Sequence, residues 1–263
     1  MIDIHNHIIY EFDDGPKSLN ESLEMLRIAV DQGIKAVFAT SHFSEVIHPE
    51  QEKDYFEKLQ ILRDKIQEKS IPIEIFSGSE MFYHHYLEKT AKQSKVGTLC
   101  ALGQYVLMEF PLYLMPSGVE ETLFRLSVED ITPIIAHPER YSTVIDHPAK
   151  VYDFLKHGAL LQVNAGSVLG KFGRKVKKVA MWLLENNLVH FIGSDAHSPK
   201  GRTFELANTA EYLKNHLDEN YLAELVEKNA QNIIDNKRLE KIQLEETEEA
   251  SNLFLRFKRK LGL

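Results

Sequence analysis

Residues 131–140 have the sequence Ile-Thr-Pro-Ile-Ile-Ala-His-Pro-Glu-Arg, a short apolar run that ends in residues able to carry chemistry. An apolar, β-branched run of this length is typical of a strand buried on both faces of a parallel sheet. The same pattern recurs along the chain, with longer segments of helical periodicity between the runs. We expect seven strands, near residues 2–4, 36–40, 73–77, 105–110, 131–136, 160–164 and 189–193.

Segment 18–32 shows the helical periodicity most clearly. Ser18 and Glu21 match a capping box, which satisfies free backbone N–H groups at a helix start, and Leu23 and Leu26 share one face. Further helices are expected over residues 54–69, 119–129, 151–157, 175–186, 204–217 and 221–236. Seven alternating units predict an α/β fold: a distorted, seven-stranded (βα) relative of the TIM barrel.

Length and composition place the chain among ordinary globular proteins. Its 263 residues suit one barrel domain, which we expect over residues 1–250. The formal net charge of -8 disfavours non-specific binding to nucleic acid, because such binding depends on neutralising phosphates with Lys and Arg. Cys100 is the single cysteine, so no intrachain disulfide can form. The first residues lack the features of a signal peptide and no apolar run could span a bilayer, so a cytoplasmic location is expected.

Residues 251–263 form a tail of different character. Leu253, Phe254, Phe257 and Leu261 would share one face of a helix, with basic residues around it. Such a helix could lie on an anionic membrane or dock on a partner. More often a helix of this kind packs on its own domain, so membrane contact is the less favoured interpretation.

Metal-ligand residues follow almost every predicted strand. In parallel barrels the carboxyl ends of the strands meet at one face, and active sites form there. The sixth predicted strand, which ends near Asn164, offers no obvious ligand. The candidate ligands are His5 and His7 after the first strand with Asp14 or its neighbour Asp13 beyond, His42 after the second, Glu80 after the third, Glu109 on the fourth, His137 after the fifth, and Asp195 and His197 after the seventh.

This set of side chains favours bound cations. His5 and His7 are two apart on a strand and so point to one face, although alone they could equally be two hydrogen-bonded core histidines. Four carboxylates in one barrel mouth would repel each other and be costly to bury without cations. Nine ligands, five of them histidines, suit two or three divalent ions of intermediate softness such as Mn, Fe or Zn.

Other histidines and aromatics are weaker candidates. We expect the histidines without ligand partners at strand ends to be surface or core residues. Phe43 and the segment 81–86 could border the mouth and pack against a substrate ring, or simply cover the barrel rim. The histidines set aside are His48, His84, His85, His147, His157, His190 and His216.

The ligand pattern resembles the PHP (polymerase and histidinol phosphatase) superfamily, which has a His-x-His on strand one, a later His, a Glu and His pair, and a terminal Asp-x-His. The resemblance covers residues 1–197. Within it, three segments are similar to the capsule-type bacterial protein-tyrosine phosphatases of the CpsB and YwqE group. They are Asp13-Asp14-Gly15-Pro16, Thr40-Ser41-His42 and His137-Pro138-Glu139-Arg140-Tyr141.

This resemblance implies a trinuclear centre, with Mn as the favoured metal and Fe, Zn or Mg as alternatives. It also implies that Arg140 and Arg202 hold the phosphate, and His42 or His197 could supply a proton. The implied ligand sets are His5, His7, Glu80 and Asp195 for one ion, Glu80, Glu109 and His137 for a second, and Asp14, His42 and His197 for a third.

The function implied by the resemblance is hydrolysis of phosphotyrosine on a bacterial tyrosine kinase that regulates capsular or extracellular polysaccharide synthesis. A small-molecule phosphatase of the same fold, for example for histidinol phosphate, stays open, as does a non-catalytic, metal-stabilised interaction module. A cysteine-based mechanism is excluded, because it needs an arginine six positions after the cysteine, where Cys100 has Val106.

Overall fold

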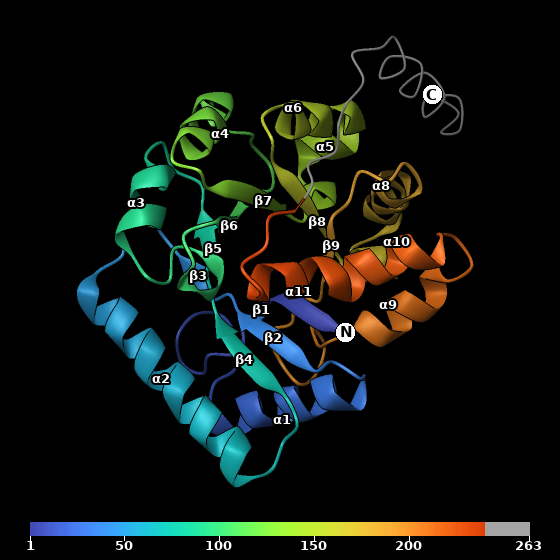
Figure 1. Cartoon of the computed structure of the whole chain (residues 1–263). Helices are drawn as coiled ribbons and strands as arrows, with labels where there is room; N and C mark the ends of the chain where they lie inside the picture. Colours follow the sequence, from blue (N-terminus) through green and yellow to red (C-terminus); the bar gives the residue numbers. More distant parts are fainter. Residues whose placement is uncertain (240–263) are drawn as a thin grey trace.

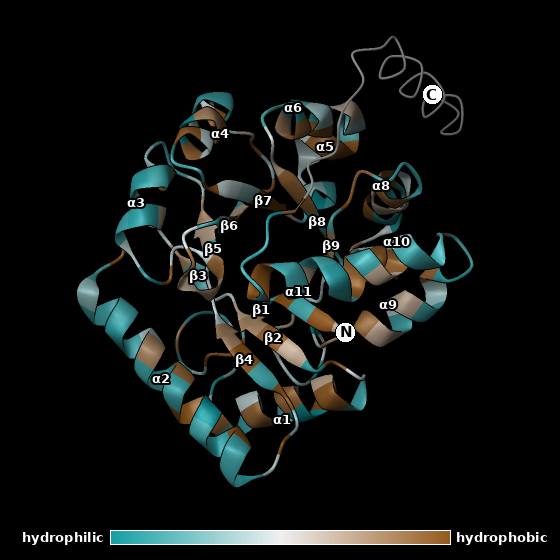
Figure 2. Ribbon diagram, viewed as in Figure 1, coloured by the Kyte–Doolittle hydropathy of each residue, from teal (hydrophilic) through white to brown (hydrophobic). Residues whose placement is uncertain are grey.

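The computed structural model describes residues 1–239 (Figure 1). The tail predicted over residues 251–263 lies outside the described residues. Within residues 1–239, no helix has the length and apolar character needed to cross a membrane. Apolar residues concentrate on the strands, whereas many residues of the surrounding helices are hydrophilic (Figure 2).

The strands form two parallel sheets, ordered β1-β2-β4 and β3-β5-β6-β7-β8-β9. The structure therefore does not contain the predicted single barrel of seven strands. Each of the seven predicted runs contains a strand, and the runs at 36–40 and 73–77 each continue, after a break, into a further short strand. The strands are β1 (Ile2–Asn6), β2 (Ala36–Ala39), β3 (His42–Phe43), β4 (Glu74–Ser77), β5 (Glu80–Phe82), β6 (Tyr105–Glu109), β7 (Thr132–Ala136), β8 (Leu160–Asn164) and β9 (Phe191–Gly193).

A buried tyrosine accounts for the two breaks. The Tyr55 hydroxyl donates to Ala39 O at 2.6 Å and accepts from Gly78 N at 3.1 Å. It thus occupies the place of a ladder hydrogen bond between the two strands where they are interrupted. A Cβ on Gly78 would lie 2.7 Å from a terminal methyl of Leu99, so a larger residue at this turn would displace that side chain.

The first and last strands meet at their carboxyl ends. His7 N donates to Ala196 O at 2.8 Å, and Asp195 N donates to His5 O at 2.7 Å. These bonds place the residues that follow β1 beside those that follow β9. The pairing of β1 with β2 shifts register between Asp3 and Asn6, a bulge at the level of His5.

Helices surround the strands (Figure 1). The Ser18 hydroxyl caps α1 by accepting from Glu21 N, as predicted, but the Glu21 carboxylate bonds Lys17 N instead of the cap residue. The helix predicted over 54–69 starts earlier, because Pro49 occupies its first turn. The helices are α1 (Leu19–Asp31), α2 (Pro49–Glu68), α3 (Leu87–Gln93), α4 (Val119–Val128), α5 (Ser142–Asp146), α6 (Val151–Lys156), α7 (Ala165–Val168), α8 (Arg174–Glu185), α9 (Leu206–Leu213), α10 (Glu219–Ala223) and α11 (Asn229–Ile234), with a π-helical turn (Glu224–Lys228) between the last two and 3-10 turns at Leu99–Ala101, Pro138–Arg140 and Pro148–Lys150.

The core has two parts. The main part lies between the strands and the surrounding helices. A smaller cluster lies inside the ring of strands, where Ile2, Ile4 and Phe191 pack with Ala230 and Ile233 of α11. α11 therefore covers the amino ends of the strands and leaves the carboxyl ends as the place for a site.

Candidate metal centre

All nine predicted ligands converge at the carboxyl ends of the strands. Their nitrogen and oxygen atoms fall into four overlapping groups that could each hold a metal ion, and within a group these atoms lie within 4.8 Å of one another. The groups are His7, Asp14, His42 and His197; His5, His7 and Glu80; His5, His137 and Asp195; and His42, Glu80 and Glu109.

Glu80, at the start of β5, lies at the centre of the cluster. Its Oε2 atom is 3.1 Å from His5 Nε2, 3.3 Å from His7 Nε2 and 3.2 Å from His42 Nδ1. Its Oε1 atom is 3.0 Å from His137 Nε2. Because the break after β4 precedes it, Glu80 points among four imidazoles while its side chain is almost fully buried.

Asp195 faces the cluster from the segment after β9. Its Oδ1 atom is 3.5 Å from His5 Nε2 and 3.6 Å from His7 Nε2. Asp195 and His137 both have positive φ, 54° and 35°, in a region that non-glycine residues rarely adopt. Such conformations concentrate at functional sites, where the surrounding structure holds them in place.

Asp13 and Asp14, between which the sequence left the choice of ligand open, make different contacts. Asp13 Oδ2 accepts from His7 Nδ1 at 2.8 Å and from His42 N at 3.0 Å. Asp14 Oδ1 instead lies 3.2 Å from His197 Nε2 and 3.7 Å from His42 Nε2. Asp14 therefore lies where a metal ligand would lie, and Asp13 orients the His7 ring by bonding Nδ1, the nitrogen opposite the one that faces the cluster.

Several buried atoms of the cluster have no hydrogen-bond partner. The two imidazole nitrogens of His5 and His7 lie 3.1–3.6 Å from the free oxygens of Glu80 and Asp195, and His197 Nε2 lies 3.2 Å from Asp14 Oδ1, all without hydrogen-bond geometry. Two ligand atoms about 2.1 Å from one ion, at bond angles between octahedral and tetrahedral, lie about 3.0–3.4 Å apart. The donor set therefore fits divalent cations. The atoms are His5 Nε2, His7 Nε2, Glu80 Oε2, Asp195 Oδ1 and His197 Nε2.

Burial and neighbouring charges set the protonation of the cluster. Burial opposes a charge on His5, but Glu80 and Asp195 outweigh it and raise the pKa of His5 to about 9. Burial and the charge of Glu80 raise the pKa of Glu109 to about 8. Burial also disfavours ionised Asp195, yet His5 and Arg202 hold the pKa of Asp195 well below its usual range. At neutral pH the metal-free cluster holds protons that cation binding must displace, so binding strengthens as pH rises.

Two arginines lie beside the cluster. The Arg140 Nη1 atom donates to Asp195 Oδ2 at 2.9 Å, and the Arg202 guanidinium bonds the same oxygen. Arg202 reaches this place because its carbonyl accepts from His197 N and Ser198 N, which closes the loop between them. Arg140 also lies over the Phe172 ring, 4.6 Å from its centroid.

The predicted aromatic rim is present only in part. Phe43 is buried against Phe12 and Tyr55, so it belongs to the core. Phe82 and Tyr86 are exposed, at 42% and 56%. The histidines set aside in the sequence join none of the four ligand groups among the described residues.

Sequence reasoning missed residues that support the ligands. β8, on which it found no ligand, places Gln162 Oε1 2.7 Å from His5 Nδ1, and Asn164 Nδ2 donates to Asp195 Oδ2 at 2.6 Å. Asp3 accepts from Ser194 N at 2.9 Å and ties β1 to the segment after β9. Two polar residues in the apolar run Leu-Leu-Gln-Val-Asn were the available signal.

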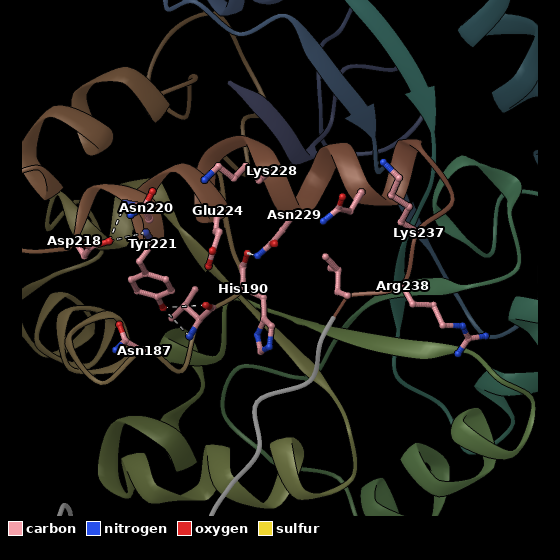
Figure 3. Close-up of a pocket in the computed structure, with 13 residues that line it drawn as sticks. Asn187, His190, Asp218, Asn220, Tyr221, Glu224, Lys228, Asn229, Lys237 and Arg238 are labelled. Carbon is pink, nitrogen blue, oxygen red and sulfur yellow. Dashed lines mark hydrogen bonds between the residues drawn. The ribbon is translucent and has the colours of Figure 1, made fainter.

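Another pocket lies at the opposite, amino end of the strands (Figure 3). Its volume is about 890 Å³, and its lining includes Asn187, His190, Tyr221, Lys228 and Arg238. None of the four ligand groups found among the described residues lies in it.

Comparison with known proteins gives consistent results. YwqE of Bacillus subtilis (strain 168), named a tyrosine-protein phosphatase, is 34% identical over 204 residues, which are 78% of this chain and 80% of the relative. A solved structure from work on YwqE and on CpsB of Streptococcus pneumoniae, described as metal-dependent tyrosine phosphatases, matches with a TM-score of 0.84 and 31% identity. That match covers 92% of this chain and 97% of the other.

More distant structures share the fold alone. Histidinol phosphate phosphatase from Lactococcus lactis, solved with zinc, matches with a TM-score of 0.53 and 14% identity, over 81% of this chain and 92% of the other.

The profile of the family described as capsular polysaccharide synthesis, CpsB/CapC, matches residues 1–235. With nearly the whole described chain matched, this protein belongs to the CpsB/CapC family.

Proposed function

We propose that this protein is a metal-dependent phosphatase that hydrolyses phosphotyrosine in proteins. The observation that carries the proposal is the convergence of nine metal-ligand side chains and two arginines at one end of the strands. Membership of a family whose relatives are named tyrosine-protein phosphatases supports the substrate class.

The ligands divide among three ions in this proposal. His5, His7, Glu80 and Asp195 would hold the first, and the short separations around Glu80 Oε2 support their grouping. Mn is the proposed metal, because mixed imidazole and carboxylate sites suit ions of intermediate softness. The second ion would take Glu80, Glu109 and His137, and the third Asp14, His42 and His197, a trio that also falls within one geometric group with His7.

The cations would supply a water of lowered pKa as nucleophile and polarise the phosphoryl oxygens. Arg140 and Arg202 would exchange their contact with Asp195 for the phosphate, because the planar guanidinium fork can donate to two phosphate oxygens at once. A tyrosine leaves as phenolate, with a pKa near 10, and so needs less protonation than an alkoxide. His42 or His197 could supply that proton, although both also have ligand positions.

Three divalent ions against four carboxylates would leave the site positive by about two charges. A phosphate dianion would therefore be attracted locally, although the chain carries a net charge of -8. We extend the proposal to the partner: the substrate would be the phosphorylated tail of the cognate bacterial tyrosine kinase that controls capsular or extracellular polysaccharide. The family description, which refers to capsular polysaccharide synthesis, supports this assignment.

The test compares substrates under defined metal conditions. The purified protein is given a phosphotyrosine peptide or histidinol phosphate, with Mn²⁺ or with a chelator, and phosphate release is measured. Metal-dependent release from the peptide, faster than from histidinol phosphate, is expected. Preference for histidinol phosphate would replace the substrate, and bound metal without hydrolysis of either would favour a non-catalytic binding role.

A further inference from the structure

β8 carries a chain of hydrogen bonds that links two proposed ligands of the first ion. His5 Nδ1 lies 2.7 Å from Gln162 Oε1, and Gln162 Nε2 donates to Asn164 Oδ1 at 2.9 Å. Asn164 Nδ2 in turn donates to Asp195 Oδ2 at 2.6 Å. All four side chains are buried, so water does not compete for these bonds.

The chemistry of the two amides fixes the direction of this chain. An ionised Asp195 only accepts, so Asn164 must turn its NH₂ toward it and its oxygen toward Gln162. Gln162 must then donate to Asn164 and present its own oxygen to His5. An oxygen at that position requires a hydrogen on His5 Nδ1. Each step follows from the one before, because an amide has one donating and one accepting end.

The opposite atoms of the two end residues remain free. Asp195 Oδ2 receives Asn164, Arg140 and Arg202, whereas its Oδ1 has no hydrogen-bond partner. His5 Nε2 also has none, and it lies 3.5 Å from Asp195 Oδ1. The hydrogen bonds therefore occupy the far side of each group and leave one atom of each directed to a common point.

We propose that Gln162 and Asn164 are positioning residues, an amide relay through which ionised Asp195 fixes the ring and tautomer of His5 so that Nε2 keeps its lone pair for a metal ion. This inference rests on the metal centre proposed above. It assigns a role to the one predicted strand that supplies no ligand.

Packing around the relay supports this role. A Cβ on Gly193 would lie 2.9 Å from Gln162 Nε2 and 2.8 Å from His5 Cβ, so β9 approaches the relay closely because position 193 is a glycine. Asn164 is held from its backbone as well, since its N–H donates to Glu139 Oε1 at 3.0 Å. The relay is thus packed closely on the side of β9 and held through the backbone at Asn164.

The first experiment measures Zn²⁺ affinity by competition with a chelator. Gln162→Met and Asn164→Leu keep the side-chain volume and remove the amides. Each is expected to weaken binding about 10- to 100-fold, as loss of a group that orients a metal-bound histidine does elsewhere. Thr209→Val, which removes another buried polar group outside the relay, is the matched control and is expected to bind as the wild type does.

The second experiment reports on His5 itself. In the Zn²⁺-loaded protein, the Nδ1–H proton of His5 is followed by NMR. Gln162→Met is expected to move this signal upfield and speed its exchange with water. Asn164→Leu is expected to do the same, although Asn164 does not touch His5, because the freed Gln162 amide can then turn over. An unchanged His5 signal in Asn164→Leu would overturn the relay.

A further variant separates this inference from the metal centre. His5→Ala removes a proposed ligand and is expected to weaken Zn²⁺ binding more than either amide variant. If His5→Ala bound Zn²⁺ like the wild type, the proposed centre would be wrong. If only His5→Ala weakened binding, the centre would stand and the relay would fail.

Discussion

His137 and His190 lie at opposite ends of the strands and are equally well buried. Burial lowers the pKa of each to about 4. His137 Nε2 lies 3.0 Å from Glu80 and 3.6 Å from Glu109, whereas His190 Nδ1 accepts from the backbone N–H of Leu161. Burial is thus common to both, and the surrounding carboxylates distinguish the ligand position from the core position.

The two ends of the strands differ from each other in the same way as these two histidines do. The amino end is closed by α11, and its pocket has Tyr221 bonded to the backbone of Val189 and Asp218 capping α10 (Figure 3). The carboxyl end gathers acidic and imidazole groups whose buried atoms lack hydrogen-bond partners. A pocket by itself therefore does not identify the functional end, whereas the unsatisfied ligand atoms point to the carboxyl end.

The largest expected effect comes from removing the histidine at the carboxyl end. His137→Ala should lower kcat/KM for a phosphotyrosine peptide at least about a thousandfold, equivalent to about 4 kcal/mol of transition-state stabilisation, because a proposed metal ligand is lost. His190→Gln is the matched variant at the other end and should leave kcat/KM unchanged. Equal losses in both variants, measured at saturating Mn²⁺, would abolish the contrast between the two ends.

Arg140→Ala should have the next largest effect, a loss in kcat of about 10²–10³-fold, since a preorganised cation at the phosphoryl group is removed. Arg202→Ala should lose less, because its side chain is 34% exposed against 16% for Arg140. Metal content is measured alongside, since both arginines contact Asp195. A larger loss for Arg202→Ala would reverse the proposed order.

His190 should affect stability in acid. Its pKa is about 4 in the folded protein and about 6.5 when unfolded, so the unfolded chain takes up the proton first as pH falls. The contribution of neutral His190 to the free energy of unfolding is complete above pH 6.5, declines as the pH falls below 6.5, and is lost as the pH falls through 4. The total loss is about 3 kcal/mol.

His190→Gln keeps an acceptor for Leu161 N–H and does not titrate. The free energy of unfolding, from urea titrations between pH 7 and pH 4, should therefore fall less steeply in His190→Gln than in the wild type. Parallel declines in the two proteins would show that another group carries the acid sensitivity.

The smallest effect is expected at Phe172. Phe172→Leu removes the aromatic face under Arg140 and keeps an apolar side chain. A cation–π contact of about 0.5–1 kcal/mol corresponds to a loss of about two- to fivefold in kcat/KM. Steady-state kinetics of Phe172→Leu beside Arg140→Ala test this, and a loss as large as that of Arg140→Ala would mean that the ring does more than support the guanidinium.

The convergence of the nine candidate ligands could be predicted because most of them lie at or just after the end of an apolar run, and parallel strands bring such ends together. The sequence could not show that the second and third runs break, since this depends on the hydroxyl of Tyr55, a residue of the connecting helix α2 whose side-chain direction the sequence does not reveal. The roles of Asp13 and Asp14 depend on side-chain direction, which adjacent positions in a loop do not reveal. Gln162 and Asn164 were overlooked because neither is a usual metal ligand.

The meeting of His5 and His7 with the segment after β9 also bears on how the protein is made. These groups lie about 190 residues apart in sequence, and their backbones bond directly. During synthesis, the residues of β1 must wait for β9, the last of the described strands, before their partners exist. Contacts of such separation form late, because a long loop must close first. Assembly of the complete ion-binding cluster would therefore come late in folding, and a chain that stopped before β9 would lack Asp195 and His197 and could not complete it.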